Sequence, residues 1–404
     1  MLNKQEAIQM AKENILPFWQ ELSDNEYGGF YGEVDFFGNV NKTADKGCVL
    51  NSRILWTFSA AHRLLGEDSY KSCAANAKNF LLSAFFDKDY GGLYWLVDHK
   101  GKPVQTRKQL YNIAFGIYAL GEHFLAFGDK TSLDMAMSLF DVLEKHGFDP
   151  VKGGYIEAKG RNWRNIDDYR LSSKDLNCPK SMNTNLHVLE ALTTLLRAAS
   201  GTVNEERIKK ALNALLRITL EKIVGGGWNF KLFFDMNWKS LSGEISYGHD
   251  IEGSWLLYEA ALALNDNELI SKTKNAAISI SEVVYSSAVD RGNGGFLSGR
   301  NEDGRLLSKR EWWPQAEAVV GFLNAYELTE NKIFFKAACG VWDFINKYFV
   351  DRIKGEWHNE LYNNNLPDTN MPKAGFWKCP YHNARACFEI IKRYDNLIPC
   401  KIQE

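Results

Sequence analysis

Apolar residues recur at helical spacing in ten internal segments of the chain, and these segments come in pairs. A spacing of i, i+3 and i+4 is typical of amphipathic helices. The paired segments are 50–65 with 73–81, 113–123 with 133–143, 186–196 with 208–223, 251–264 with 269–284, and 316–328 with 334–349. Segments 4–22 and 382–394, at the two ends of the chain, are expected to form a sixth pair with each other.

A glycine-rich, aromatic turn stands between successive helix pairs. It begins at Gly28, Gly91, Gly153, Gly225, Gly294 and Gly355, so that its period runs from 61 to 72 residues. Paired glycines followed by aromatic residues suit tight turns that open short strands. Each repeat is therefore predicted to contain one small β-hairpin.

Six helix pairs at a nearly constant period predict a repeat architecture. A helix pair cannot bury its apolar face alone, and closure into a ring gives every pair two neighbours. We expect an all-α fold, an (α/α)6 barrel of six helix-pair repeats with short β-hairpins in the connecting loops, formed by residues 1–404 as one domain. An open solenoid is the alternative, but the terminal repeats show no polar capping face.

Composition and charge narrow the class of partner. Apolar residues make up 45% of the chain and charged residues 24%, as in soluble globular proteins. The formal charge of -2 is spread without basic or acidic blocks, which argues against nucleic acid and anionic membranes as partners. Residues 1–19 predict an amphipathic helix instead of a secretion signal, and no stretch is apolar enough to span a membrane.

Cysteine usage indicates a reducing compartment. The seven cysteines are an odd number without a C-x-x-C pair, which argues against a disulfide framework and against a structural zinc site. We therefore expect a cytoplasmic protein. The cysteines are Cys48, Cys73, Cys178, Cys339, Cys379, Cys387 and Cys400.

Unusual polar and aromatic residues occupy the opening turns of the first helix of each pair. They are Arg53, Tyr111, Asn112, Asn183, His187, His249, Glu252, Trp312, Trp313, Glu317, His382 and Arg385. The offsets His187 to His249, His249 to Trp313 and Trp313 to His382 are 62, 64 and 69 residues, close to the repeat period. Equivalent positions in a ring face the same end, so three histidines in register should converge on one pocket.

Two imidazoles that face each other across an aromatic pocket suit proton transfer at a carbon next to a carbonyl. Near neutral pH, one can act as the base and the other as the conjugate acid. Glu252 follows His249 by three residues and is expected to hold its imidazole. Glu317, from the adjacent repeat, is expected to orient His382.

Other chemistries fit the same residues less well. No H-E-x-x-H motif is present and the converging acids are a whole repeat apart, so we predict no metal site. A glycosidase needs two carboxylic acids that flank the scissile bond, whereas the acids here support a centre rich in histidine. No G-x-S-x-G elbow, phosphate loop or dinucleotide fingerprint occurs.

Six motifs, in order along nearly the whole chain, resemble those of the N-acylglucosamine 2-epimerase superfamily, and most closely its branch that acts on cellobiose. They are residues 51–56, 111–115, 182–187, 247–252, 312–317 and 377–383. The resemblance implies an (α/α)6 barrel that inverts C2 of the reducing-end glucose of β-1,4-linked disaccharides. Cellobiose would give glucosyl-mannose, and lactose would give epilactose.

The resemblance also implies roles for individual residues. His249 and His382 match the acid/base pair, and His187 and Arg53 match the groups that bind and polarise O1 and O2. The substrate-binding and supporting residues are Tyr111, Asn183, Glu252, Trp313, Glu317 and Trp377, with Asp175 reaching the substrate from the long loop 158–178. Trp313 and Trp377 are expected to stack on sugar rings.

The implied reaction passes through a cis-enediolate and needs no cofactor. The only partner expected is the disaccharide, and the chain is expected to be a monomer or weak homodimer. Alternative activities for the same barrel fold are those of a mannose 2-epimerase, an aldose-ketose isomerase and an N-acylglucosamine 2-epimerase. A glycosidase and a non-catalytic sugar-binding module are alternatives of other classes.

Overall fold

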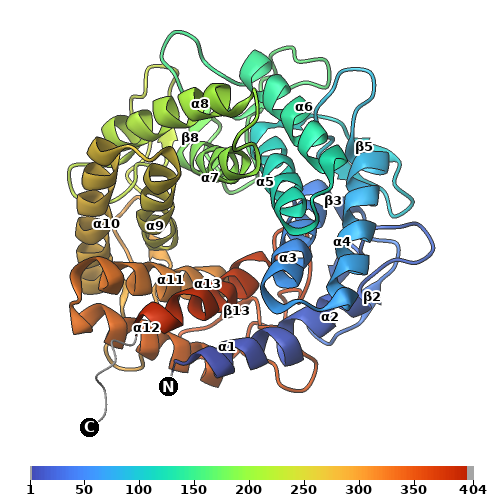
Figure 1. The fold of residues 1–404 in the computed structure, drawn as a ribbon. Coiled ribbons are helices and arrows are strands. Elements are labelled where there is room, and N and C mark those ends of the chain that lie inside the picture. The colour runs from blue at the N-terminus through green and yellow to red at the C-terminus, as the bar shows by residue number, and fades with distance from the viewer. Residues whose placement is uncertain (1, 398–404) are drawn as a thin grey trace.

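A computed structural model describes residues 2–397, in which two concentric rings of helices surround a central axis (Figure 1). The inner ring consists of α3 (Cys48–Leu65), α5 (Leu110–Phe127), α7 (Met182–Ala198), α9 (Tyr247–Leu264), α11 (Trp312–Thr329) and α13 (Tyr381–Leu397). The outer ring consists of α1 (Lys4–Gln9), η1 (Met10–Ile15), α2 (Leu16–Glu21), α4 (Asp68–Phe80), η2 (Leu81–Phe85), α6 (Lys130–His146), α8 (Glu205–Ile218), η3 (Thr219–Ile223), α10 (Asn267–Ala288), α12 (Lys332–Phe344) and η4 (Ile345–Phe349). The predicted (α/α)6 barrel is confirmed.

The two ends of the chain close the ring. Helix α13 packs against α11 on one side and α3 on the other, and it also contacts α1. Buried Trp19 donates its indole N–H to Glu356 at 2.5 Å, which ties the first helix to the last repeat. The described part of the chain therefore forms a closed barrel, and the open solenoid is wrong.

The inner helices begin before the apolar pattern does. Helix α5 starts at Leu110 and α9 at Tyr247, three and four residues ahead of the first periodic apolar residues at 113 and 251. Ser246 caps α9 by accepting from the backbone N–H of His249. The first turn of these helices carries polar side chains, which hide it from a search for apolar periodicity but place those side chains at one end of the ring.

Six glycine turns stand at that same end, and one β-bridge closes each of them. The bridges are Ser23–Phe30, Phe86–Leu93, Phe148–Tyr155, Val224–Phe230, Val289–Phe296 and Val350–Trp357. Gly91 and Gly92 have φ of +70° and +73°, in the left-handed region where glycine carries no Cβ penalty.

Short strands then link each repeat to the next instead of pairing only within it. The pairs across repeats are β3 (Lys46–Gly47) with β4 (Leu96–Val97), β6 (Lys108–Gln109) with β7 (Ala158–Lys159), β8 (Lys180–Ser181) with β9 (Phe233–Phe234), β10 (Ile245–Ser246) with β11 (Gly299–Arg300), and β12 (Arg310–Glu311) with β13 (Glu360–Leu361). Hairpins within a repeat also occur, as β1 (Glu33–Val34) with β2 (Val40–Asn41) and β4 with β5 (Pro103–Gln105). The bridge between Val34 and Ala374 joins the last repeat to the first.

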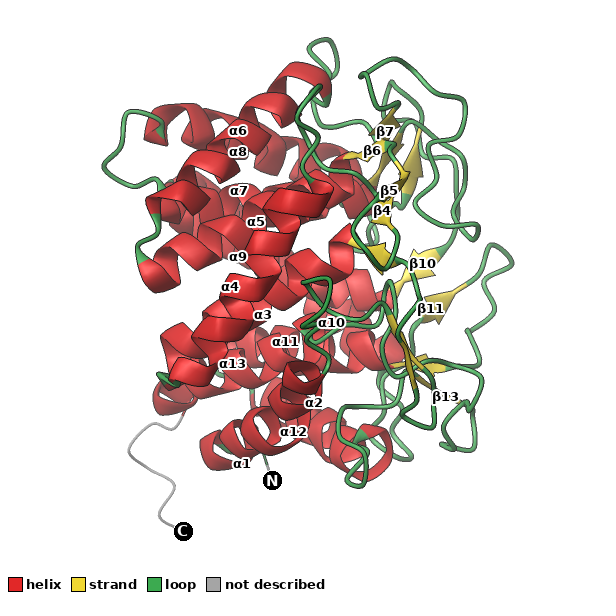
Figure 2. Ribbon diagram, turned by 90° about the vertical axis from the view of Figure 1, so that its right-hand side faces the viewer, coloured by secondary structure: helices red, strands yellow, loops and turns green. Residues whose placement is uncertain are grey.

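The prediction of one independent hairpin per repeat is therefore incomplete, because most of these strands connect neighbouring repeats. Figure 2 shows the strands and long loops gathered at one end of the barrel, opposite the short helix connections.

An ion pair joins an aspartate at the start of the glycine turn to a basic residue ahead of the inner helix in five of the six repeats, and both partners are buried in the first three repeats. The pairs are Lys46–Asp24 at 2.6 Å, Lys108–Asp87 at 2.9 Å, Lys180–Asp149 at 2.6 Å, Arg310–Asp290 at 2.7 Å and Lys373–Asp351 at 2.7 Å. In the fourth repeat the two corresponding positions hold Gly225 and Ile245. Both charges are absent together there, as expected because an unpaired buried charge is costly.

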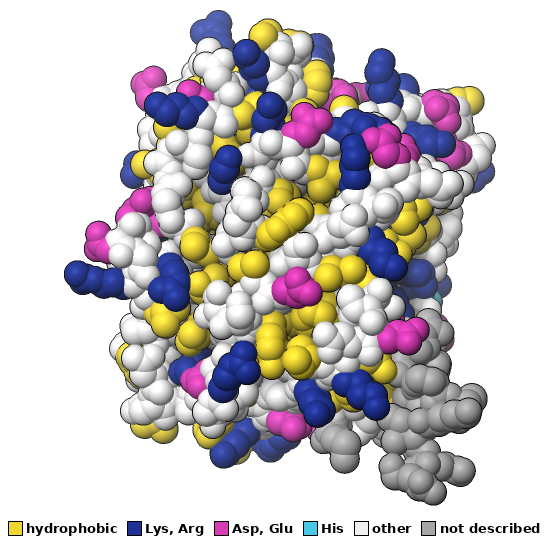
Figure 3. Space-filling view, turned by 90° about the vertical axis from the view of Figure 1, so that its left-hand side faces the viewer, with side chains coloured by type: hydrophobic (Ala, Val, Ile, Leu, Met, Phe, Trp, Pro, Cys, Tyr) yellow, Lys and Arg dark blue, Asp and Glu magenta, His cyan; other side chains and the backbone are white. Residues whose placement is uncertain are grey.

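The outer surface carries both signs of charge. Figure 3 shows one side of the barrel, on which lysine, arginine, aspartate and glutamate side chains are scattered among apolar ones. Among residues 2–397, no helix is long and apolar enough to cross a membrane. The six cysteines in this range are free, while Met1 and Cys400 lie outside the described residues.

Candidate active site

A cavity of about 420 Å³ opens at the end of the barrel where the inner helices begin. Ten of the eleven predicted site residues line it: Arg53, Tyr111, Asp175, Asn183, His187, His249, Glu252, Trp313, Trp377 and His382. Glu317 does not reach this cavity and lies fully buried behind His382. The predicted convergence on one pocket is thus present, with one residue behind its wall.

His382 lies in the first turn of α13 and is held by a carboxylate. Its Nδ1 lies 2.7 Å from Glu317 Oε1 on α11. Donation from Nδ1–H to the carboxylate leaves Nε2 as the basic nitrogen. Burial, followed by the positive charge of Arg53, lowers the pKa of His382 well below its ordinary value.

His249 has a different partner from the one the sequence suggests. Its Nδ1 lies 2.7 Å from Ser246 Oγ, the residue that caps α9. Glu252 makes no hydrogen bond to His249 and instead accepts from Arg385 Nη2 at 2.5 Å. The prediction that Glu252 holds His249 is wrong, because the helix cap takes Nδ1. Burial lowers the pKa of His249 to about 3, which favours the neutral imidazole near neutral pH.

His187 lies deeper in the barrel than the other two histidines. It is the sixth residue of α7, whereas His249 is the third of α9 and His382 the second of α13. The prediction that the three are in register is therefore wrong for His187, by about one helical turn. Its Nδ1 lies 2.9 Å from Glu190 Oε2, three residues further along the helix.

Glu190 was not among the residues predicted from the sequence, although its spacing from His187 gave a signal. His187 and Glu190 have the same spacing as His249 and Glu252, and only the first of these two pairs makes a contact. Glu190 also accepts from Tyr381 Oη and from Arg385 Nη1. Burial alone would raise its pKa, but Arg385 and His187 lower it to about 2.

The indole ring of Trp313 contacts the imidazoles of both His249 and His382. Its ring centroid is 4.7 Å from that of His249 and 5.5 Å from that of His382. The two imidazoles come from different helix pairs, α9 and α13. The Trp313 indole gives both imidazoles an apolar neighbour.

Arg53 supplies positive charge on another wall. It is buried, donates from Nη2 to Tyr111 Oη at 2.7 Å, and lies 4.2 Å above the ring of Phe115. Its Nε has no hydrogen-bond partner in the structure. A guanidinium held in this way is suited to stabilise an oxyanion that develops in the cavity.

Beneath the cavity, Arg385 bridges three glutamates. It donates from Nη2 to Oε1 of Glu252 at 2.5 Å and to Oε1 of Glu317 at 2.6 Å, and from Nη1 to Glu190. Burial and the nearby Glu317 raise the pKa of Glu252 to about 7. Glu252, Glu317 and His382 offer ligand atoms within 4.8 Å of one another, and a cation of the chain itself already bridges the two carboxylates.

The mouth of the cavity is formed by loops. The segment between β7 and β8 contributes Asp175, whose Oδ2 accepts from the backbone N–H of Ser172 at 2.7 Å. Trp377 is 39% exposed there and makes edge contacts with Trp95 and Tyr111, so an indole face is open to a ligand. Asp175, Asn183 and His249 also line a neighbouring cavity of about 270 Å³ under the same loop.

These features define the class: an (α/α)6-barrel protein with a cavity of histidines, guanidinium and indole rings over an acidic cluster. The sequence model of the protein family described as "N-acylglucosamine 2-epimerase (GlcNAc 2-epimerase)" matches residues 29–386 of this chain. The chain therefore belongs to the N-acylglucosamine 2-epimerase family, and it is an epimerase-family enzyme.

Individual proteins that are similar to this chain support the family assignment. A cellobiose 2-epimerase of Bacteroides fragilis is 42% identical over 395 residues, which cover 96% of this chain and 98% of that one. The structure of cellobiose 2-epimerase from Bacillus thermoamylovorans matches with a TM-score of 0.92 and 38% identity, over 96% of this chain and 99% of that one. A crystal structure of D-mannose isomerase, 22% identical, shares the fold with a TM-score of 0.82 over 96% of this chain and 98% of that one.

Proposed function

We propose that this chain inverts C2 of the reducing-end glucose of β-1,4-linked disaccharides, converting cellobiose to glucosyl-mannose and lactose to epilactose. The observation that carries the proposal is the packing of His249 and His382 against one indole, that of Trp313, inside a single cavity. The names of the relatives that are about 40% identical over nearly the full length support cellobiose as the substrate.

The proposed reaction begins when the sugar ring opens to the free aldehyde. Either His249 or His382 then removes the C2 proton through Nε2, and the electron pair of the C–H bond forms a cis-enediolate with charge on O1. Arg53 stabilises that charge as a buried cation on the wall of the cavity, and Nε2 of His187 accepts a hydrogen bond from the O2 hydroxyl.

Inversion follows from rotation about the C2–C3 bond, after which the other imidazole protonates C2 on the opposite face. Burial lowers the pKa values of both imidazoles and so favours their neutral forms. The negative charge of the enediolate favours the protonated form of a nearby imidazole, so the second histidine takes up a proton from solvent once the intermediate is present. After the turnover the first imidazole releases the proton that came from C2 to solvent.

The arrangement of carboxylates speaks against glycoside hydrolysis. A glycosidase places two carboxyl groups on either side of the scissile bond. Here Glu252 and Glu317 both accept from Arg385, and Glu317 does not reach the cavity.

Product analysis of cellobiose incubated with the protein tests the proposal. Glucosyl-mannose should form without free glucose. Free glucose would indicate hydrolysis, and release of the disaccharide unchanged after binding would indicate a sugar-binding module. In a parallel incubation with mannose, formation of fructose while cellobiose stays unchanged would indicate an aldose-ketose isomerase that acts on single sugars and would reject the proposal.

A further inference from the structure

Arg385 joins two of the three histidines of the cavity through their carboxylate partners. Its Nη1 donates to Glu190, whose other oxygen lies 2.9 Å from His187 Nδ1. Its Nη2 donates to Glu317 Oε1 at 2.6 Å, the same oxygen that lies 2.7 Å from His382 Nδ1. One planar group therefore fixes both acceptors, a geometry that the fork of an arginine permits and the single ammonium of a lysine does not.

The Arg385 side chain is almost completely buried. Arg385 is 1% exposed, and its Cζ lies 4.2 Å from the ring centroid of Tyr381 and 4.9 Å from that of Trp255. Glu190 and Glu317 are also buried. Carboxylates in such surroundings need a fixed partner, since an unpaired buried charge is strongly unfavourable.

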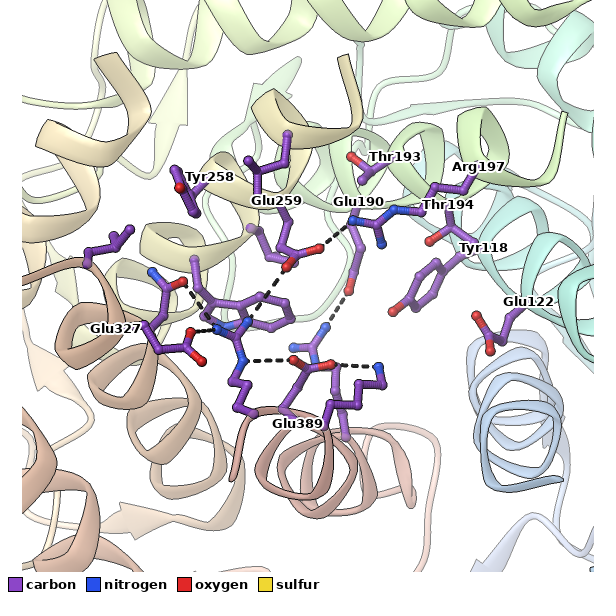
Figure 4. A pocket seen from close by; sticks show the side chains of 18 of the residues that line it. Tyr118, Glu122, Glu190, Thr193, Thr194, Arg197, Tyr258, Glu259, Glu327 and Glu389 are labelled. Carbon is purple, nitrogen blue, oxygen red and sulfur yellow. Dashed lines mark hydrogen bonds and ion pairs between the residues drawn. The ribbon is translucent and has the colours of Figure 1, made fainter. Parts of the chain in front are cut away.

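The far side of this cluster faces a second cavity at the opposite end of the barrel. Figure 4 shows Glu190 on its wall, in a hydrogen bond or ion pair with a guanidinium, among other charged side chains that are paired with one another. Arg385 and Glu190 line this second cavity, which has a volume of about 1190 Å³. The Arg385 cluster thus separates the histidines from the other mouth of the barrel.

We propose that Arg385 is a positioning residue that holds the carboxylates of Glu190 and Glu317 so that His187 and His382 both keep the proton on Nδ1 and present an unprotonated Nε2 to the cavity. The catalytic part of this inference rests on the proposed epimerisation, whereas the tautomers can be observed without substrate. His249 stands outside the arrangement because its Nδ1 pairs with Ser246.

Helix α13 offers a matched control. Arg393, eight residues further along, is also buried and also pairs with three carboxylates, Glu259, Glu327 and Glu389, but it contacts no histidine of the cavity. The change Arg393→Met therefore removes a comparable ion-pair network from the same helix.

The experiment compares the wild-type protein with Arg385→Met, Arg385→Lys and Arg393→Met. Nitrogen-15 NMR of histidine-labelled protein reports the tautomer of each ring, with His382 and His187 assigned by their glutamine variants. Thermal unfolding monitors the fold. With cellobiose, kcat and KM are measured separately.

We expect both arginine-385 variants to change the tautomer of His187 and His382 but not that of His249. Their kcat should fall at least about tenfold with KM within about threefold, as for other groups that orient a functional imidazole. Arg393→Met should lower the unfolding temperature and leave the tautomers and kcat unchanged. The lysine variant keeps the charge, so it provides the test if the methionine variant fails to fold.

Unchanged histidine signals in folded Arg385→Lys would overturn the proposal, as would an equal loss of kcat in Arg393→Met. If the wild-type protein does not epimerise cellobiose, the proposed function fails while the tautomers still decide the role of Arg385.

Discussion

His249 and His382 pack against the same indole, that of Trp313, but their Nδ1 atoms face different partners, a serine hydroxyl and a carboxylate. A hydroxyl can donate or accept, so Ser246 permits either tautomer of His249. The Glu317 carboxylate only accepts, and it fixes the proton of His382 on Nδ1. The two proposed bases are therefore chemically unequal before any substrate binds.

This inequality predicts unequal effects of removing the two partners. Glu317→Gln should lower kcat about tenfold to 100-fold, because an amide can present its N–H₂ to Nδ1 and favour the wrong tautomer. Ser246→Ala should cost less than about tenfold. Steady-state kinetics on cellobiose checks the order, with unfolding temperatures to separate loss of fold from loss of rate. A larger effect of Ser246→Ala would show that the carboxylate does not orient the base.

Acid should destabilise the fold through His249. The folded state holds this imidazole neutral, with its pKa lowered by burial to about 3 from an ordinary value of 6.5. Below pH 6.5 the imidazole binds a proton in the unfolded chain but not in the folded chain. The free energy of unfolding therefore decreases as pH falls from 6.5 towards 3.

His249→Gln should remove this loss. Because His249 is partly open to the cavity, the loss relative to neutral pH should be at most about 2 kcal/mol at pH 5. Urea unfolding at pH 7.5 and pH 5 measures it, with the partly exposed His99→Gln as control. An equal pH dependence in wild-type and His249→Gln protein would count against a neutral His249.

Trp377 should matter for disaccharides and not for single sugars. It stands at the mouth of the cavity with part of its indole exposed, where the non-reducing unit of a disaccharide would lie. Trp377→Ala should raise KM for cellobiose about threefold to tenfold, which is the loss of affinity expected when one aromatic contact is removed. The value of kcat should change little. For mannose, KM should stay the same. An equal rise for both sugars would place Trp377 against the reducing-end unit instead.

The repeated ion pair should contribute strongly to stability. Lys46→Met leaves Asp24 buried without its cation and should cost about 3–5 kcal/mol. The double variant Asp24→Asn, Lys46→Met should recover a large part of that cost, because the fourth repeat does without both charges at Gly225 and Ile245. Chemical unfolding of the wild-type protein, Lys46→Met, Asp24→Asn and the double variant measures the coupling, and additive effects would contradict it.

The periodicity of the sequence was sufficient to predict the architecture. Helices α3 to α12 follow the apolar spacing because each must bury one face against its neighbours, and the glycine turns set the period. The ends of the inner helices were harder to place, since their first turns carry His249, Tyr111 and other polar or aromatic residues in place of the apolar stripe.

The composition of the cavity was also predictable, but the partners of its residues were not. A spacing of three residues brings His187 to Glu190 and fails to bring His249 to Glu252, because the N-cap of α9 competes for the imidazole. The role of Arg385 depends on three carboxylates from α7, α9 and α11, far apart in the sequence. Such contacts follow from closure of the ring and have no local signature.

Replacement of the C2 hydrogen by deuterium in heavy water tests the two-histidine mechanism most directly. Cellobiose is incubated with the protein in deuterated buffer, and proton NMR follows C2 of substrate and product from the first turnovers. The account predicts that the new mannose unit carries deuterium at C2 from the start, because a second imidazole equilibrated with solvent delivers it, while unreacted cellobiose keeps its hydrogen. Product that retains the original C2 hydrogen would contradict it.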